Sequence, residues 1–234
     1  MSVRRLWTGW WMGLAGQGAL GRLAMGLAAW PVRPYYARHA LARRHACGWY
    51  APSAELAHSD LRLGRHVFVD ERVLIFRDAG GAEVMVGDGA HIHRDTIVQT
   101  GQGGRVRIGE GTSIQARCVL CAYLGPLTIG ARVQIAPHCG IYNYNHAMDP
   151  EIPMRDQPLT SRGGILIEDD AWIGYGATIL DGAHIGEGAV IGAGAVVSGY
   201  VPPHSVAAGV PARIVKQRGA KSQKTELRTL GGGR

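Results

Sequence analysis

A six-residue repeat runs without a gap from Ile167 to Pro202 and constrains the fold more than any other feature of the chain. The six consecutive hexads read IEDDAW, IGYGAT, ILDGAH, IGEGAV, IGAGAV and VSGYVP. Each begins with an aliphatic residue, and the fifth position is Ala in all but the last. A period of six matches neither the 3.6 of a helix face nor the 2 of a single strand. It indicates a solenoid of short strands and tight corners.

The residue types of the hexad also predict its geometry. One large aliphatic side chain per hexad points inward, and the small fifth residue fits a crowded corner. Glycine at the second or fourth position permits close approach or an unusual φ there. Successive coils are expected to hydrogen-bond to one another about 4.8 Å apart.

The same pattern recurs upstream, so that the repeat covers about 63–208. The upstream hexads are LGRHVF and VDERVL from Leu63, VGDGAH and IHRDTI from Val86, IGEGTS and IQARCV from Ile108, and IGARVQ and IAPHCG from Ile129. Short and long interruptions fall at 74–84 and 143–165. Because a polar loop ejected from a solenoid commonly carries function, we expect the site at the longer one. The predicted organisation is an all-β solenoid domain over 51–212 with its loop at 143–165, an N-terminal helical segment over 1–50 and a short basic tail over 213–234.

Charge is distributed unevenly along the chain. The whole chain carries +7, residues 1–44 carry seven arginines and no acid, 213–234 carry a net +6, and 45–212 are therefore net −6. A nucleic-acid-binding protein usually concentrates positive charge on its folded face, so this class is disfavoured. Basic flanks fit an anionic membrane surface or a phosphorylated cofactor better.

The N-terminal stretch 6–30 is apolar and rich in tryptophan, but Gln17 and Arg22 interrupt it. We expect a helix that lies at a membrane interface or caps the protein's own core, in preference to a spanning or cleaved segment. The prediction is a cytoplasmic protein with peripheral contact at the inner membrane face through 1–44.

The four cysteines do not predict a metal site. Cys118 and Cys121 form one C-x-x-C, but no second follows, and the repeat places them at an inward position and a turn. Reduced, buried cysteines are the expectation, and no metal is predicted.

Three segments resemble the hexapeptide-repeat acyltransferases, the family that includes galactoside, maltose, serine, xenobiotic and polysaccharide acetyltransferases. They are IAPHCGIYNYNHAMDP at 135–150, AWIGYGATILDGAHIGEGAVIGAGAVV at 171–197 and VPPHSVAAGVPARIV at 201–215. The resemblance implies a left-handed parallel β-helix, a homotrimer, and transfer of an acetyl group from acetyl-CoA to a hydroxyl of a sugar or a cell-surface polysaccharide precursor, free or lipid-linked.

The resemblance marks His146 as the catalytic residue. Independently, an imidazole has an ordinary pKa of about 6.5 and is suited to take a hydroxyl proton near neutral pH. It also implies acceptor contacts from the loop residues Asn143, Tyr144 and Asp149. The positions that match coenzyme A contacts are Trp172, Tyr175, Ala193, Ser198, Gly199, Arg213 and Lys216.

The chain departs from the family at two points. Ser198-Gly199 stands where many members have Thr-Lys, so recognition of the 3′-phosphate is expected to rest on Lys216, Arg218 or Lys221. The asparagine that galactoside-type members carry one coil before the loop is not evident in 118–123, which disfavours simple galactosides.

Four alternatives remain open at this stage. One is N-acylation of an amino-sugar nucleotide, and another is an acyl-enzyme formed on Cys118 or Cys139. A third is a zinc enzyme like the γ-class carbonic anhydrases, built from His91, His93, His138 and His146, although His138 is expected to face out from a corner. The last is a β-helix scaffold without activity.

Overall fold

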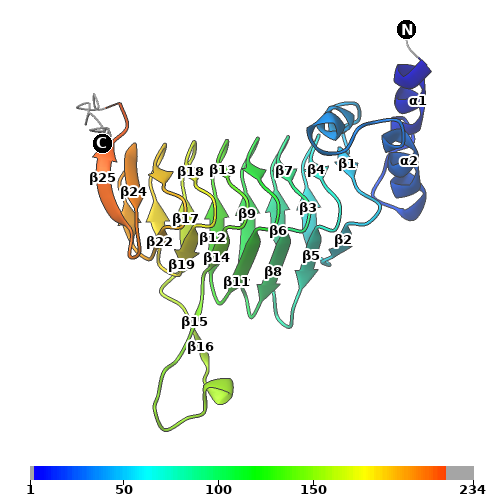
Figure 1. The fold of residues 1–234 in the computed structure, drawn as a ribbon. Coiled ribbons are helices and arrows are strands. Elements are labelled where there is room, and N and C mark those ends of the chain that lie inside the picture. Colours follow the sequence, from blue (N-terminus) through cyan, green and yellow to red (C-terminus); the bar gives the residue numbers. More distant parts are fainter. Residues whose placement is uncertain (1–2, 220–234) are drawn as a thin grey trace, which may run out of the picture.

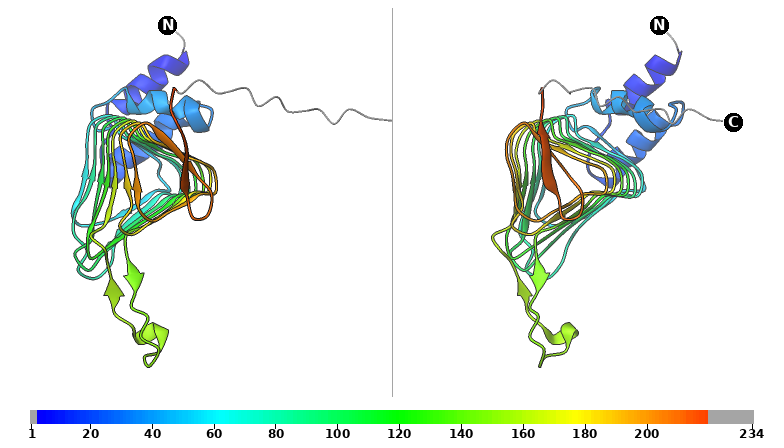
Figure 2. Two further views of the ribbon diagram at one scale, coloured as in Figure 1. Left: turned by 90° about the vertical axis from the view of Figure 1, so that its left-hand side faces the viewer. Right: turned by 60° about the vertical axis from the view of Figure 1, so that its left-hand side comes forward.

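The computed structural model describes residues 3–219 and consists of a three-sided β-helix with helices at one end (Figure 1). Seen close to the helix axis, the coils form a triangular prism (Figure 2). Within 3–219, each side of the prism is one sheet of parallel strands. The first sheet contains β1 (Trp49–Tyr50), β4 (Phe68–Val69), β7 (His91–Ile92), β10 (Ser113–Ile114), β13 (Gln134–Ile135), β18 (Trp172–Ile173), β21 (Val190–Ile191) and β24 (Ser205–Ala208).

The other two sheets complete each coil. The second contains β2 (Glu55–Ala57), β5 (Leu74–Arg77), β8 (Ile97–Gly101), β11 (Val119–Tyr123), β14 (Gly140–Tyr142), β19 (Thr178–Leu180) and β22 (Val196–Val197). The third contains β3 (Leu61–Leu63), β6 (Val84–Val86), β9 (Arg105–Ile108), β12 (Pro126–Ile129), β17 (Ile165–Ile167), β20 (His184–Ile185) and β23 (Tyr200–Val201). The fold is the left-handed parallel β-helix that the family resemblance implied.

The strand register explains the hexad. Ile167 pairs with Ile185, Ile173 with Ile191 and Ile179 with Val197, so three hexads make one coil. All of these first-position side chains are buried. The core is therefore a set of aliphatic ladders, and stacking them removes from water the apolar faces that a single coil would expose.

The corners use the fourth and second positions of the hexad differently. The fourth position has a positive φ in every hexad but the last, whether or not it is glycine, as at His138 (φ 63°) and Gly194 (φ 67°). At the second position glycine provides space, because a Cβ on Gly174 would lie 2.7 Å from the backbone nitrogen of Ala193 in the next coil. Close stacking of the coils is the physical reason for that glycine.

The β-helix begins earlier than the repeat suggested. Its first coil, β1 to β3, begins before the hexads that start at Leu63. Tyr50 fills the inner position there in place of an aliphatic residue, in the row of Val69 and Ile92, whereas Trp49 faces outward in the row of Phe68 and is buried. The four N-terminal helices are α1 (Val3–Met12), α2 (Ala19–Ala29), the 3-10 helix η1 (Tyr35–Arg38) and α3 (His39–Ala42). The helical segment and the solenoid therefore meet close to residue 49.

These helices cap the open end of the first coil. The indole Nε1 of Trp49 donates to the carbonyl oxygen of Met25 at 3.0 Å. The guanidinium of Arg22 donates to the carbonyl oxygens of Ala51 and Pro52 at 3.2 and 2.9 Å, and also to that of Ala54. The arginine that interrupts the apolar stretch thus satisfies backbone groups at the end of the solenoid. Among residues 3–219, no helix combines the length and the apolar character that crossing a bilayer requires.

The C-terminal end is closed by β25 (Arg213–Gln217), which folds back antiparallel on β24. This strand lies within the range assigned to a basic tail. The rest of that range, including Lys221, lies outside the described residues.

Candidate active site

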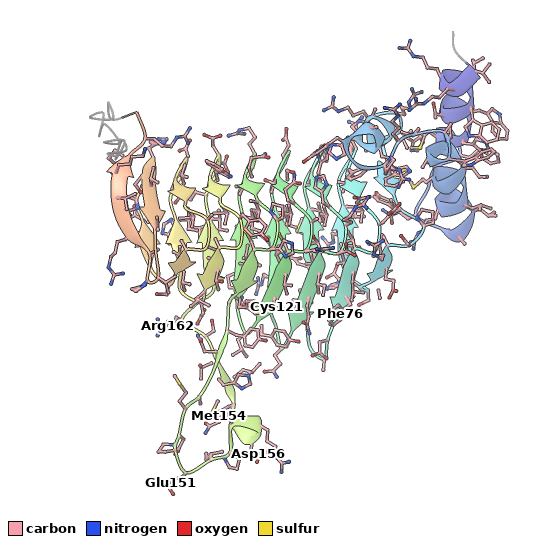
Figure 3. The ribbon with its side chains drawn as sticks, in the orientation of Figure 1. Phe76, Cys121, Glu151, Met154, Asp156 and Arg162 are labelled. Carbon is pink, nitrogen blue, oxygen red and sulfur yellow. The ribbon has the colours of Figure 1, made fainter. Side chains whose placement is uncertain are left out.

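The segment 143–165 leaves the prism between β14 and β17 as a projecting hairpin (Figure 1). Its arms are β15 (Asn145–His146) and β16 (Leu159–Thr160), in which Asn145 pairs with Thr160 and His146 with Leu159. A short 3-10 helix, η2 (Met154–Asp156), forms near the tip. Figure 3 shows Glu151, Met154 and Asp156 far from the coils and Arg162 at the base. The loop predicted from the broken repeat is therefore an ordered arm beside the solenoid.

A single buried carboxylate holds the base of this arm. Asp181 is 2% exposed. Its Oδ1 accepts from the Ser161 hydroxyl at 3.0 Å and from the Gly164 N–H at 3.3 Å. Its Oδ2 accepts from the Arg162 N–H and from the Asn145 side-chain amide at 3.3 Å. Asp181 thus connects both arms of the hairpin to one corner of the coil, and one of its donors, Asn145, directly precedes His146.

His146 presents an exposed imidazole on the first arm. Within residues 3–219 its ring makes no hydrogen bond, and its nearest aromatic neighbour is Tyr144, with ring centroids 6.4 Å apart. An unoccupied imidazole at the solenoid surface can accept a proton from a bound molecule.

The three predicted acceptor residues occupy different environments. Asn143 is fully buried, its Oδ1 accepting from the Tyr123 N–H at 2.7 Å and its Nδ2 donating to the Gly125 carbonyl at 2.8 Å. Its amide therefore maintains the corner from which the loop departs. Asp149 lies further out, where its carboxylate accepts from the Glu151 N–H at 2.9 Å. Only Tyr144 lies next to His146.

Sequence reasoning missed a polar and aromatic cluster on the coils before the loop. The Tyr123 ring lies 4.8 Å from that of Tyr144. Its hydroxyl donates to the Asp78 carboxylate at 2.8 Å and accepts from the side-chain amide of Gln99. Burial and this carboxylate raise the pKa of Tyr123 well above its usual range, so the phenol stays a hydrogen-bond donor. The glycine at position 101 is the sequence feature that relates to this cluster, because a Cβ there would lie 2.1 Å from the Tyr123 ring and prevent its packing.

Three of the predicted cofactor residues come together beyond the loop. Ser198, Gly199 and Arg213 line one cavity of about 280 Å³ between β22, β23 and the start of β25. Ser198 follows β22 at the same corner from which the loop departs two coils earlier. At the roughly 4.8 Å spacing of strands, this cavity lies about 10 Å along the axis from the loop base.

The other cofactor residues lie on the first sheet and its adjoining corner. Trp172 and Lys216 lie in the same row of paired residues across neighbouring strands, with Val190 and Val206 between them. Trp172 is 55% exposed. Tyr175 is 57% exposed, and its ring contacts that of His138 in a tilted arrangement with centroids 5.3 Å apart. Ala193 occupies the same corner one coil later. Within the described chain, the seven positions therefore form two groups on neighbouring sides of the prism.

Cys118 and Cys139 lie inside the coils. Cys118 donates to the Ala136 carbonyl and Cys139 to the Gly174 carbonyl, each at 3.2 Å, and both are buried. Cys121 is buried in β11, where a turn was expected. Its Sγ lies 3.6 Å from Oε1 of Gln99, on the outer side of the sheet. The thiols of Cys118 and Cys139 point into the coils, which disfavours an acyl-enzyme on either of them.

Comparison with known proteins agrees with this architecture. Residues 164–199 match the model of the bacterial transferase hexapeptide repeat. A Dictyostelium discoideum protein provisionally named an acetyltransferase is 38% identical over 58% of this chain and 70% of its own length. The chain belongs to the hexapeptide-repeat acetyltransferase family.

Other relatives extend the comparison. A Mycobacterium tuberculosis protein provisionally named an acetyltransferase is 31% identical over 76% of this chain, which spans 61% of that relative's length. A provisionally named lipopolysaccharide biosynthesis O-acetyl transferase of Escherichia coli is 36% identical over 41% of this chain and 53% of its own length. The crystal structure of a polySia-specific acetyltransferase superposes with a TM-score of 0.57 at 25% identity, covering 71% of this chain and 76% of the other.

Proposed function

We propose that this protein is an acetyl-CoA-dependent O-acetyltransferase that modifies a hydroxyl of a saccharide, with His146 as general base. The observation that carries the proposal is the exposed, unengaged imidazole of His146 on an ordered arm. Tyr123 and Tyr144 lie on the side of the earlier coils, and the cavity lined by Arg213 lies two coils beyond. Family membership supports acetyl transfer, and the relative named as an O-acetyl transferase supports a hydroxyl acceptor.

The reaction needs one proton transfer and one displacement. A ring nitrogen of His146 takes the proton of the acceptor hydroxyl as its oxygen attacks the thioester carbonyl carbon. The tetrahedral intermediate then collapses, the carbon–sulfur bond breaks, and the imidazolium returns the proton to the departing thiolate. Backbone N–H groups along the coils can stabilise the oxyanion. Because Cys118 and Cys139 are buried, we propose direct attack on the thioester.

We place the donor on the coils that follow the loop. The guanidinium of Arg213 and the ammonium of Lys216, both exposed on β25, supply positive charge for the phosphates of coenzyme A. Trp172 and Tyr175 supply exposed aromatic surface for the rest of the cofactor.

We place the acceptor on the coils that precede the loop. The rings of Tyr123 and Tyr144 offer apolar faces for a sugar ring, and Asp78 and Gln99 offer polar groups for its hydroxyls. The solved polySia-specific acetyltransferase supports an acceptor of this class. N-acylation of an amino-sugar nucleotide is the alternative, and an inactive scaffold would release no thiol from acetyl-CoA.

We propose that the protein is a homotrimer whose coenzyme A site is shared between neighbouring subunits. Trp172, Tyr175 and Tyr200 are each more than half exposed on the C-terminal coils of the single chain. Exposed aromatic surface of this kind is typical of an interface. We expect sedimentation as a trimer, and a stable, active monomer would contradict a site shared between subunits.

Replacing His146 by alanine tests the central claim. We expect turnover to fall by about 10² to 10⁴-fold while acetyl-CoA affinity and the oligomer are retained, because the side chain lies outside the core. His138→Ala, an exposed corner histidine, is the matched control and should do far less. Retention of more than about a tenth of wild-type thiol release would contradict the base role. Mass analysis of the product separates an ester from an amide.

We also propose that the helical cap contacts an anionic membrane surface. Large apolar side chains remain exposed on α1, α2 and their connections: Val3, Leu6, Trp10, Leu14, Leu20, Leu23 and Trp30. Beside them, Arg4, Arg5 and Arg44 line a cavity of about 270 Å³ that suits a phosphate. Apolar surface next to arginines is typical of interfacial binding.

Point variants test this contact better than deletion, because Met25 and Leu41 of the cap belong to the buried core. The double variant Leu20→Ser/Leu23→Ser should bind vesicles containing anionic lipid at least about tenfold more weakly. Leu166→Ser, an exposed leucine on the third sheet, is the control. Equal partitioning of wild type and double variant would contradict the proposal.

A further inference from the structure

Three histidines come together where the helical cap meets the β-helix. His39 begins α3, whereas His91 lies on β7 and His93 directly follows it. Because alternate residues of a strand face the same side, His91 and His93 both face α3. One ring nitrogen from each of the three lies within 4.8 Å of the other two.

We propose that His39, His91 and His93 form a Zn²⁺ site that clamps the helical cap to the β-helix. The ring centroids are 4.3 Å apart for His39 and His91, 5.1 Å for His39 and His93, and 6.4 Å for His91 and His93. Three rings bound to one tetrahedral zinc at about 2.1 Å would have centroids about 5 Å apart. Closing the site therefore needs movements on the order of 1 Å.

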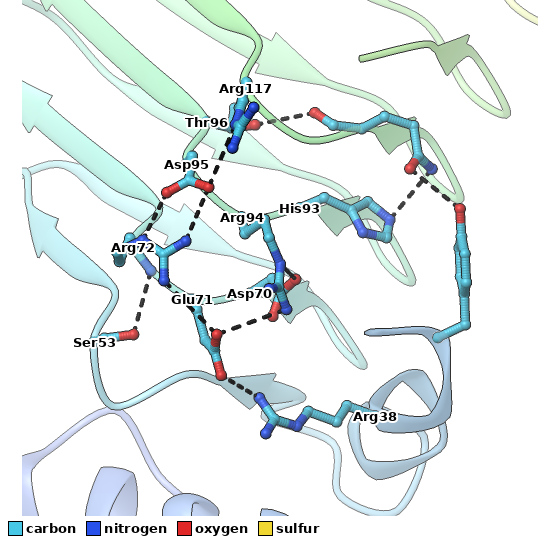
Figure 4. Close-up of polar contacts among 12 residues, drawn as sticks. Arg38, Ser53, Asp70, Glu71, Arg72, His93, Arg94, Asp95, Thr96 and Arg117 are labelled. Atoms are coloured by element: carbon cyan, nitrogen blue, oxygen red, sulfur yellow. Dashed lines mark hydrogen bonds and ion pairs between the residues drawn. The ribbon is translucent and has the colours of Figure 1, made fainter. Parts of the chain in front are cut away.

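Two buried polar atoms distinguish this cluster from a packed set of aromatic rings. Nε2 of His39 and Oδ1 of Asp70 are both buried, and neither has a hydrogen-bond partner among residues 3–219. Register places Asp70, after β4, beside His93, after β7 (Figure 4). If the rings are only packed together, both atoms lose their hydrogen bonds to water without replacement, which costs stability. A metal ion would bind Nε2 of His39, and the carboxylate of Asp70 would balance its positive charge.

The surroundings suit a divalent cation. Burial lowers the pKa of each of the three imidazoles to about 4, so all are in the neutral form that ligates metal. Asp70 opposes this shift at His39 and His93, which indicates its proximity to both. The positive charges of Arg43 and Arg94 lower the pKa of His91 and His93, respectively, but the charge of Arg94 is paired with Asp70 and Glu71.

A metal ion could reach the three histidines from solvent, and only a weak contact would compete with it. A cavity of about 430 Å³, lined by Arg43, His66, Gly89, His91 and Gly111, opens onto the cluster at His91. The Gln115 amide lies 3.4 Å from Nε2 of His93, a long contact that a metal could displace. Three imidazole nitrogens are a ligand set typical of Zn²⁺.

Metal titration of the untagged full chain, first stripped with a chelator, tests the site. We expect one Zn²⁺ per chain, visible absorption typical of tetrahedral Co²⁺ when that ion is used, and a rise in Tm of about 5 °C or more at 100-fold excess of Zn²⁺ over its Kd. Less than about 0.2 Zn²⁺ per chain would overturn the proposal. Because this readout uses the wild-type protein, it does not depend on a variant that folds.

Variants locate the ion. His39→Gln and His93→Gln should each weaken Zn²⁺ binding by more than about 100-fold, since even outer-shell changes cost 10 to 100-fold. His138→Gln should leave it unchanged. The competing position is Cys47 with His45, whose Sγ and Nδ1 are 2.8 Å apart. Binding that survives His39→Gln but is lost in Cys47→Ser would overturn the assignment.

Discussion

Replacing Asp181 by asparagine should loosen the hairpin that carries His146 while preserving the coil beneath it. The substitution keeps the size and shape of the side chain and changes only what it can accept. All four groups that face the carboxylate are donors, from Asn145, Ser161, Arg162 and Gly164. An asparagine can present its oxygen to one pair of donors but must turn its own N–H₂ toward the other pair.

The cost follows from that count. Two accepted bonds are lost, and a hydrogen bond to a charged group contributes about 1.5 to 3 kcal/mol. Relaxation of the structure and entry of water recover part of the lost hydrogen-bond energy. We therefore expect the free energy that favours the closed hairpin over the open one to fall by about 3 kcal/mol, which raises the opening equilibrium constant about 150-fold. Turnover should fall at least about tenfold because the base is no longer held in place.

Amide hydrogen exchange measures the opening directly. The N–H groups of Arg162 and Gly164 should exchange about 100-fold faster in Asp181→Asn, while those of β19 and β22 keep their protection. Asp169→Asn is the matched control, because that carboxylate accepts from the Ala131 N–H at 2.8 Å, at a corner away from the hairpin. Unchanged exchange at residues 162 and 164, or an equal effect of the control, would show that Asp181 does not hold the arm.

Two further predictions concern stability. Burial lowers the pKa of His39, His91 and His93 to about 4, below the roughly 6.5 of the unfolded chain. The unfolded state therefore binds more protons between these values, and stability should fall as pH decreases from 6.5 to 4. With a chelator present, the free energy of unfolding measured in urea should fall by about 1 kcal/mol per imidazole between pH 7 and 5, after allowance for partial exposure. His93→Gln should make this fall with pH smaller, and an equal pH dependence in wild type and variant would contradict the prediction. Gly174→Ala should destabilise by about 1 to 3 kcal/mol, because the added Cβ meets the next coil, whereas Gly199→Ala, with open space around it, should leave Tm nearly unchanged.

The solenoid could be predicted because its signal is local and repeated. Every coil needs the same inward aliphatic residue and the same small fifth residue, so Ile173 and Ala177 carry information that Ile191 and Ala195 repeat. The first coil escaped prediction because Tyr50 fills its inner position and Trp49 packs on its outer face against the helices. Their size suits the end of the prism, where helices supply part of the surrounding surface.

The site was predictable only in part, because its residues come from different coils. The broken repeat indicated the loop and therefore His146. Tyr123 and Asp78 are 45 residues apart and meet only through the register of stacked strands. Asn143 was expected to contact the acceptor because it is a polar residue at the start of the loop. Its amide is instead hydrogen-bonded to the backbone of the corner from which the loop departs, which the sequence alone does not show.

The strand β25 has a consequence for the solution behaviour of the protein. A stack of parallel coils ends in a row of unpaired backbone groups, which is a template for adding strands from another molecule. Here the final strand runs antiparallel, with a register shift between Val206 and Ala207, and carries Arg213 and Lys216. Reversed direction, irregular spacing and positive charge each disfavour a further copy docking end to end. The helical cap covers the opposite end, so this chain can stack its own coils without polymerising into fibres.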